Sequence, residues 1–187
     1  MHRTRITVAA FIALFALPAS AQLVGLGVGT MVPQGDLANG AKTGFAAIAS
    51  VEFGGKIAVR AEGLWTNSSL KGAFSGSGLP SSSSVSGNVK LIGGIGSLVV
   101  HLASGPIEPY LLGGAGYYQQ NVSEDVSGAV SGLTHLSAKE SKVGFHFGAG
   151  LKFRVLGLAA FGEARYHTVN TSGSKTNFIP ILVGIRL

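Results

Sequence analysis

Nine charged side chains lie within apolar segments, at positions where they could share one interior. Only 12% of the residues are Asp, Glu, Lys or Arg, whereas an average soluble chain has about 25%. Buried charges need partners, because an isolated ion inside a protein is strongly destabilising. We therefore expect a network of ion pairs, and the alternative is a polar track for small solutes. The residues expected to point inward are Glu52, Arg60, Glu62, Lys90, Glu108, Lys152, Glu163, Arg165 and Arg186.

Other patterns that could support chemistry are weak. His146 and His167 could meet on neighbouring strands, but two histidines without a further carboxylate or thiolate ligand make a poor metal site. The chain has no cysteine, which excludes a thiolate nucleophile, a Cys-based metal site and a disulfide framework. The stretches GLGVGT and GGIGS lack the spacing of a phosphate-binding loop, and no helix follows them. We expect no catalytic residue, no bound metal and no cofactor.

The segments that contain the charges have apolar side chains at every second position, which is typical of β-strands. In the segment 142–155, Phe145 and Phe147 share one face, and His146 and Lys152 share the other. A soluble barrel would need many more charges on its exterior than this chain has. The alternation therefore favours a membrane barrel with an apolar exterior and a narrow lumen. Several glycines are expected to face that lumen and to leave room in it: Gly94, Gly96, Gly114, Gly116, Gly148 and Gly150.

The strand-like segments and the lengths of their connections predict the architecture. The connections after the first, third, fifth and seventh segments are longer than the other three, which is typical of a transmembrane barrel with short periplasmic turns. We expect an all-β fold, an eight-stranded antiparallel up-and-down transmembrane β-barrel with both termini on the periplasmic side. The longest connections, 67–87 and 121–141, should form its outward face. The eight segments are 23–32, 43–53, 56–66, 88–102, 107–120, 142–155, 158–169 and 177–187.

The two ends of the chain add a compartment and a closure. Residues 1–21 have two arginines, an apolar run and the small residues Ala-Ser-Ala, and so predict a cleaved signal peptide before a barrel domain at 22–187. The mature chain then has twelve basic and eight acidic residues, a net charge of +4 that does not suggest nucleic-acid binding. The last segment is an apolar strand, and its edge should be closed by pairing with the first. An aromatic girdle near the strand ends is expected from Trp65, Tyr117 and Tyr166.

The chain resembles the small bacterial outer-membrane β-barrel family of the OmpX- and OmpW-like type, along its whole mature length. The stretches that show this are VPQGDL, PYLLGGAGYY, GFHFGAGLKFRV, FGEARYH and the terminal FIPILVGIRL. The resemblance implies a place in the bacterial outer membrane, contact with outer-membrane lipids and lipopolysaccharide, and recognition of the terminal strand by the barrel-assembly machinery. In that family the terminal strand usually ends in an aromatic residue, whereas this one ends in Leu187.

The sequence is consistent with three functions, which we rank from the most to the least favoured. We expect a monomeric integral barrel with a structural or surface-interaction role. The alternative is a narrow passive channel for small or hydrophobic solutes. A lipid-modifying outer-membrane enzyme comes third, because the resemblance to lipid A deacylases requires a Ser two residues after a His, and Val169 stands two residues after His167. A Ser or Thr within hydrogen-bond reach of His167 would favour the enzyme.

Overall fold

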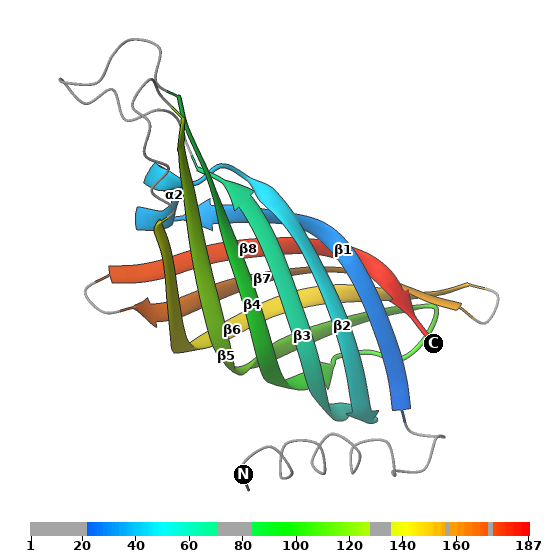
Figure 1. The fold of residues 1–187 in the computed structure, drawn as a ribbon. Helices are drawn as coiled ribbons and strands as arrows, with labels where there is room; N and C mark the ends of the chain where they lie inside the picture. The colour runs from blue at the N-terminus through cyan, green and yellow to red at the C-terminus, as the bar shows by residue number, and fades with distance from the viewer. Residues whose placement is uncertain (1–21, 71–83, 128–135, 156–157, 172–173) are drawn as a thin grey trace, which may run out of the picture.

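Eight antiparallel strands close into a single barrel in the computed structural model (Figure 1). The structure describes residues 22–70, 84–127, 136–155, 158–171 and 174–187, and the predicted signal peptide lies outside these residues. Each strand pairs with its neighbours in sequence, and β8 pairs with β1, so the predicted fold class is confirmed. The elements are β1 (Gln22–Gln34), α2 (Asp36–Gly40), β2 (Gly44–Gly54), β3 (Ile57–Ser69), β4 (Ser84–His101), β5 (Ile107–Ser127), β6 (Leu136–Val155), β7 (Leu158–Thr171) and β8 (Ser174–Arg186). Within the described residues, no helix has the length and apolar character needed to cross a membrane.

The barrel has two different ends. At the end that we call the turn end, short connections join β2 to β3, β4 to β5 and β6 to β7. Both the start of β1 and the end of β8 also lie there (Figure 1). The backbone groups of Val24 and Leu187 exchange hydrogen bonds of 2.9 and 2.8 Å, so the last residue pairs with the first strand as expected. The opposite end, which we call the loop end, has the remaining connections.

Three strands run far beyond their neighbours at the loop end (Figure 1). β4 and β5 stay paired out to Ser84 and Ser127, and β5 and β6 stay paired out to Glu124 and Leu136. β7 pairs with β6 only from Gly144 onward. We call this projecting part of β4, β5 and β6 the sheet extension; it comprises residues 84–87, 119–127 and 136–143.

The sheet extension corrects the predicted connections. Much of 121–141 was expected to be a loop, but it is strand on both sides of residues 128–135. The connection after β7 was expected to be long, and only residues 172 and 173 separate β7 from β8. Polar residues favoured a loop prediction at these places, yet a strand that extends beyond the membrane can carry polar residues on both faces. The change to a polar sequence therefore marked where the apolar outer surface of the barrel ends, and not where the strands end.

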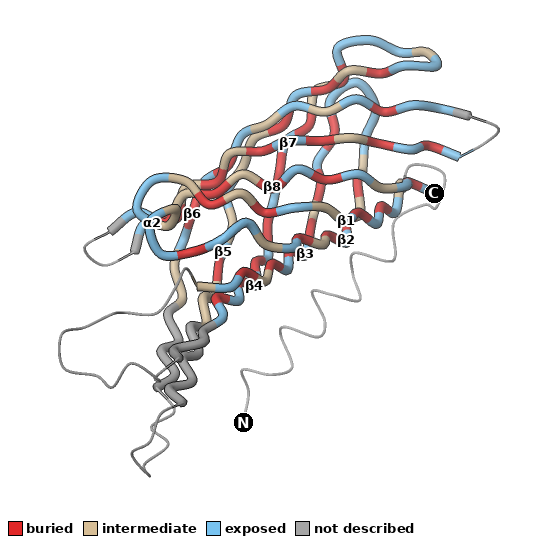
Figure 2. The backbone as a smooth tube through the Cα atoms, turned by 90° about the horizontal axis from the view of Figure 1, so that it is seen from above, coloured by how far each residue is buried: buried red, intermediate tan, exposed pale blue. Residues whose placement is uncertain are grey.

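Burial alternates along each strand, as the period of two predicts (Figure 2). On β7, Phe161 and Arg165 are buried in the barrel, whereas Leu158 and Ala160 are exposed outside. The lumen itself differs between its two halves. Toward the loop end it is packed with apolar side chains from seven strands, and Leu37 of α2 packs against them. The inward face was expected to be small or charged throughout, and this apolar half is a correction.

Candidate functional site

The lumen holds eight buried charged side chains, four acidic and four basic. Each is between 0 and 6% exposed. Because strand side chains alternate between faces, these residues reach one interior from β2, β3, β5, β6, β7 and β8. Eight of the nine charges singled out from the sequence lie here: Glu52, Glu62, Glu108, Glu163, Arg60, Lys152, Arg165 and Arg186.

Lys90 is the exception, because its side chain is exposed on the outside of the barrel. The faces of β4 are the reverse of the expected ones. Leu91, Ile95 and Ser97 point into the lumen, whereas Gly94 lies on the exposed face with Lys90. A shift of one residue in a strand exchanges its two faces, and β4 has large apolar residues on both.

Glu163 is the centre of the charge network. Its carboxylate accepts a hydrogen bond of 2.8 Å from Arg60 Nη1 and another of 2.8 Å from the Tyr110 hydroxyl. Arg165 Nε also donates to it, and Arg186 Nη2 lies 3.8 Å away. Three cations therefore share this one carboxylate, and removing its charge would leave one positive charge in the lumen without a counter-charge.

Two further carboxylates link the same cations into a network. Glu52 accepts hydrogen bonds from Arg60 Nε at 2.8 Å and Arg186 Nη1 at 3.1 Å. Glu62 forms a pair with Arg165, whose Nη1 donates to Oε1 at 2.9 Å. The network thus joins β2, β3, β7 and β8 across the lumen. These ion pairs link opposite walls of the barrel in a space that solvent scarcely reaches.

A smaller group of charges lies near the turn end. Glu108 pairs with Lys152 inside the barrel and with Arg154 Nη2 at 3.0 Å. The Arg154 side chain is 61% exposed, so it connects the network to the rim. His101 lies between the two groups, because its Nε2 is 3.0 Å from Glu52 Oε1 and its Nδ1 is 4.0 Å from Glu108 Oε2.

Some members of the network were not identified from the sequence. Tyr110, His101 and Ser97 all hydrogen-bond to luminal carboxylates. Tyr110 could have been found, since it lies two residues after Glu108 in the same strand and so on the same face. Ser97 could not, because the faces of β4 were reversed.

His146 and His167 lie side by side as predicted, and their rings stack on each other. His146 and His167 are directly opposite on β6 and β7, with ring centroids 5.1 Å apart and an interplanar angle of 20°. His167 also stacks on Phe178 at 4.8 Å, and its Nδ1 is 2.8 Å from the Tyr118 hydroxyl. Within the described residues, no group of three or more His, Cys, Asp or Glu could hold a metal ion.

The hydroxyl contacts of these histidines bear on the enzyme alternative. The described hydroxyl bonded to His167 belongs to Tyr118. Ser97 Oγ does lie 3.0 Å from His146 Nε2, but it also donates to Glu62 at 2.9 Å. In a hydrolase with a catalytic triad, the carboxylate binds and orients the histidine. Here the Glu62 carboxylate accepts a hydrogen bond from the serine instead. Ser97 and His146 are 4% and 3% exposed, so a lipid would not reach them.

The inward glycines were expected to leave room in the lumen, which kept the alternative of a solute track open, and aromatic rings occupy much of that room. A Cβ on Gly150 would overlap the Tyr110 ring. A Cβ on Gly144 or on Gly116 would lie 2.9 or 3.1 Å from the Tyr118 ring. The other inward glycines are also covered: Gly148 by Arg165, and Gly114 by the backbone of the neighbouring strand. Gly94 and Gly96, predicted to face the lumen, lie on the exposed face of β4.

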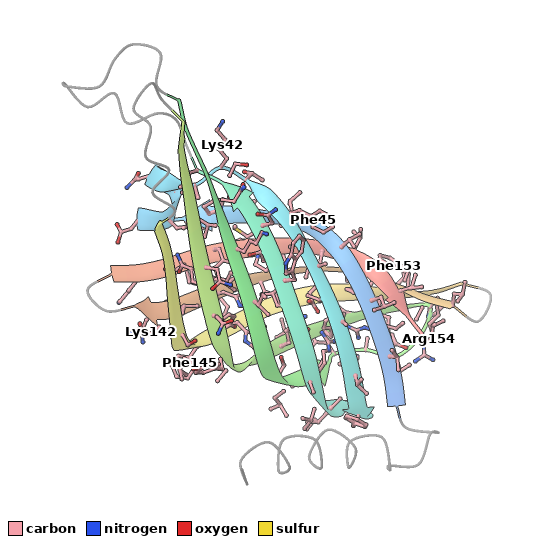
Figure 3. All side chains as sticks on the ribbon, viewed as in Figure 1. Lys42, Phe45, Lys142, Phe145, Phe153 and Arg154 are labelled. Carbon is pink, nitrogen blue, oxygen red and sulfur yellow. The ribbon has the colours of Figure 1, made fainter. Side chains whose placement is uncertain are left out.

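The outside of the barrel is apolar. Val28, Phe147 and Val183 are 51, 66 and 61% exposed, although each is fully apolar. Figure 3 shows Phe45 and Phe145 toward the loop end of the belt and Phe153 toward the turn end. The chain is therefore turned inside out relative to a soluble protein, with charges inside and apolar side chains outside.

The three residues expected in an aromatic girdle all lie on this outer surface. Trp65 and Tyr117 are 38 and 58% exposed. Trp65 packs edge-to-face on Phe45 with ring centroids 5.9 Å apart, and Tyr166 packs on Phe147 at 5.5 Å. Two phenylalanines thus join the aromatic residues that were singled out from the sequence.

Comparison with known proteins agrees with this inside-out barrel. A family model described as the outer membrane protein beta-barrel domain matches residues 7–186. A search of curated proteins gave no match.

Similar solved structures include Ail, the attachment invasion locus protein of Yersinia pestis, in complex with the heparin analogue sucrose octasulfate. It is 19% identical, with a TM-score of 0.52 over 89% of this chain and 99% of that one. Neisserial surface protein A is 16% identical, with a TM-score of 0.59 over 89% and 96%. A major outer membrane protein from Thermus thermophilus is 10% identical, with a TM-score of 0.59 over 89% and 98%. At these identities the likeness shows the fold alone.

Proposed function

This chain belongs to the outer membrane protein beta-barrel domain family, and from that premise we propose that it is a closed barrel that presents a structured surface outside the cell. As a member of the family, it is an integral protein of the bacterial outer membrane and is surrounded by membrane lipid. The proposal concerns what the barrel does there. It combines a lumen that does not conduct with a loop end that projects from the membrane.

The observation that carries the proposal is the filled lumen. Toward the turn end, four carboxylates and four cations neutralise each other across the interior. Toward the loop end, an apolar cluster that includes Leu64, Tyr118 and Phe178 fills the lumen. Eight strands leave an interior just wide enough for side chains to fill. An ion entering from either side would meet a paired charge network or an apolar layer.

The sheet extension supports the surface role. It lies at the loop end, opposite the start of β1 and the end of β8, and we place that end outside the cell because short turns face the periplasm in barrels of this kind. The described register of β6 with β7 begins at Gly144, whereas its pairing with β5 continues to Leu136. A paired sheet that continues past the barrel wall gives the extension a regular backbone. The extension thus offers a contact surface that is held by the rigid barrel beneath it.

The remaining expectations follow from the same premise. We propose that residues 1–21 are a cleaved signal peptide, and that the terminal strand is recognised by the barrel-assembly machinery. We propose that the barrel is a monomer and is not an enzyme, because the Ser97–His146 contact is buried and its carboxylate is wrongly placed for catalysis. The aromatic pair of Phe45 and Trp65 fits the outer girdle.

Conductance in a planar lipid bilayer tests the closed lumen. The mature chain is refolded into vesicles, its folding is checked by circular dichroism, and it is fused with a bilayer beside a porin as positive control. We expect no reproducible current steps from the chain, because the charge network and the apolar layer both block the path.

Discrete openings of constant size would contradict the closed barrel and favour the solute channel. In that case a Glu163→Gln variant would change the ion selectivity of the openings, since Glu163 lies at the centre of the luminal charges. A current that appears only in poorly folded samples would be leakage, and the closed barrel would stand.

A further inference from the structure

The balance of charge inside the lumen determines the charge of the outside. The mature chain has a net charge of +4 from twelve basic and eight acidic residues. The eight luminal charges cancel, so the rest of the chain carries the whole excess. Exposed lysines at the loop end include Lys42, Lys90 and Lys175. Lys56 and Arg154 carry part of this excess at the turn end, and Asp36 is exposed at the loop end, so single lysines, and not a uniformly basic rim, complement an anionic lipid surface.

One of these lysines stands in an ordered polar row on the outer surface. The strand registers place Phe45 opposite Asn67, Asn67 opposite Lys90, and Lys90 opposite Asn121. Facing side chains on adjacent strands have their Cβ atoms about 5 Å apart. The row therefore presents one ammonium group between two amides, across β3, β4 and β5.

The row directly beneath is aromatic and apolar on β3 and β4 and continues to Gln119 on β5. It places Trp65 opposite Ile92, which are 38 and 47% exposed. Trp65 also contacts Phe45 edge-to-face at 5.9 Å. A flat indole face beside hydrogen-bonding amides suits the apolar face and hydroxyl groups of a sugar ring. The change from apolar to polar at this level places it at the outer membrane interface.

A separate observation indicates a missing donor at this place. The Oδ1 atom of Asn67 is buried and has no hydrogen-bond partner in the protein. A buried acceptor without a partner costs about 1–3 kcal/mol, and a ligand hydroxyl would satisfy it once the Asn67 side chain turns outward. Below Trp65, Gly63 and Gly94 leave open space on the outer surface, where an acyl chain can lie flat against the strands.

We propose that Trp65, Asn67, Lys90 and Asn121 form a binding site for the phosphorylated sugar headgroup of an outer-leaflet glycolipid. Lys90 pairs with the phosphate, the two amides bind sugar hydroxyls, and Trp65 packs on the sugar ring. We call these four residues the headgroup site. It rests on the membrane placement of the chain and not on the closed lumen, so a conducting barrel would leave it standing.

Trp65 makes the site directly observable, because it is the single tryptophan of the sequence. The mature chain is refolded in vesicles of phosphatidylcholine, and lipid A is added while Trp65 fluorescence is recorded. We expect a saturable change in emission. Dephosphorylated lipid A should bind more weakly, because it lacks the partner of Lys90. Phosphatidylglycerol should bind more weakly, because its headgroup carries no sugar ring.

Variants assign the response to the site. Lys90→Gln should weaken lipid A binding about fivefold, the effect expected of one lysine near an anionic membrane surface, and Lys90→Arg should retain it. Asn67→Ala should also weaken binding. Lys56→Gln is the matched control, because Lys56 is an exposed lysine at the turn end and its replacement should change nothing. Circular dichroism establishes that each variant is folded.

Several results would overturn the headgroup site. One is equal binding of lipid A by the wild type and Lys90→Gln, and another is a wild-type Trp65 signal that does not saturate. An equal response to phosphatidylglycerol would show a charge effect without sugar recognition. A soluble sulfated polysaccharide that bound at Lys90 while lipid A did not would assign the residues to an external polyanion instead.

Discussion

Glu163 illustrates how single residues stabilise this lumen. Its carboxylate is bonded by Arg60, Arg165 and Tyr110, all buried. A buried ion pair contributes little net stability relative to an apolar replacement, but loss of one partner leaves the other charge buried without a counter-charge. The eight luminal charges are therefore interdependent. Any single neutralisation leaves an excess charge in a space that solvent does not reach.

Replacing Glu163 with Gln should destabilise the barrel by about 3–5 kcal/mol, the usual effect of breaking a buried pair. Urea unfolding of the refolded chain in vesicles, followed by Trp65 fluorescence, measures the difference. Asp36→Asn is the control, because Asp36 is exposed and outside the network; it should change stability by less than about 0.5 kcal/mol. An effect of Glu163→Gln as small as that of the control would mean that the network does not brace the lumen.

Two features of individual strands explain how the elements fit together. Inward glycines let the rings of Tyr110 and Tyr118 pack closely against neighbouring strands, so small residues here serve tight packing.

In β8, Pro180 lacks an N–H group, and the β7–β8 ladder has no pair at Arg165–Pro180. Pairing of Pro180 with Met31 of β1 is retained. The strand thus tolerates a proline because only one of its two ladders is interrupted.

Gly150→Ala should destabilise the barrel by about 1–3 kcal/mol, because the new methyl group overpacks against the Tyr110 ring. Gly94→Ala is the matched control on the outer surface, where a Cβ meets open space, and it should be nearly neutral. Both are measured by urea unfolding in vesicles. In a Tyr110→Ala background the effect of Gly150→Ala should disappear; if it persists there, the loss has another cause than the ring.

The whole molecule is polarised from one end to the other. Its turn end holds the start of β1, the end of β8, a paired charge network and short connections, and its loop end holds the apolar cluster of the lumen, α2 and the sheet extension. Figure 3 shows the charged side chains of Lys42 and Arg154 at opposite ends of the apolar belt. Because its two ends differ, we expect the barrel to insert into the outer membrane in one orientation. That orientation determines which end is available to partners outside the cell.

Single cysteines test that orientation, because the sequence has no cysteine of its own. Ser69→Cys lies at the exposed loop end and Lys56→Cys at the exposed turn end. On intact cells a thiol reagent that cannot cross the membrane should label Ser69→Cys alone. Lys56→Cys should become labelled once the outer membrane is permeabilised. The reverse pattern would place the turn end outside and contradict the orientation proposed here.

The sequence by itself determined the fold class, the number of strands and the faces of most of them. These depend on the pleat, which sends successive side chains to opposite faces wherever one face is apolar. For β7 this was enough to place Glu163 and Arg165 in the lumen. The joining of β8 to β1 was also predictable, since an apolar edge needs a partner.

Only the tertiary structure decided the face of β4, the extent of β5 and β6, and the contents of the lumen. β4 has large apolar residues on both faces, such as Ile95 inside and Ile92 outside, so no local pattern sets its register. That register depends on pairing with β3 and β5. The space beside an inward glycine is likewise decided by a ring from another strand. Contacts between residues far apart in the chain are absent from any local pattern, and they close this barrel.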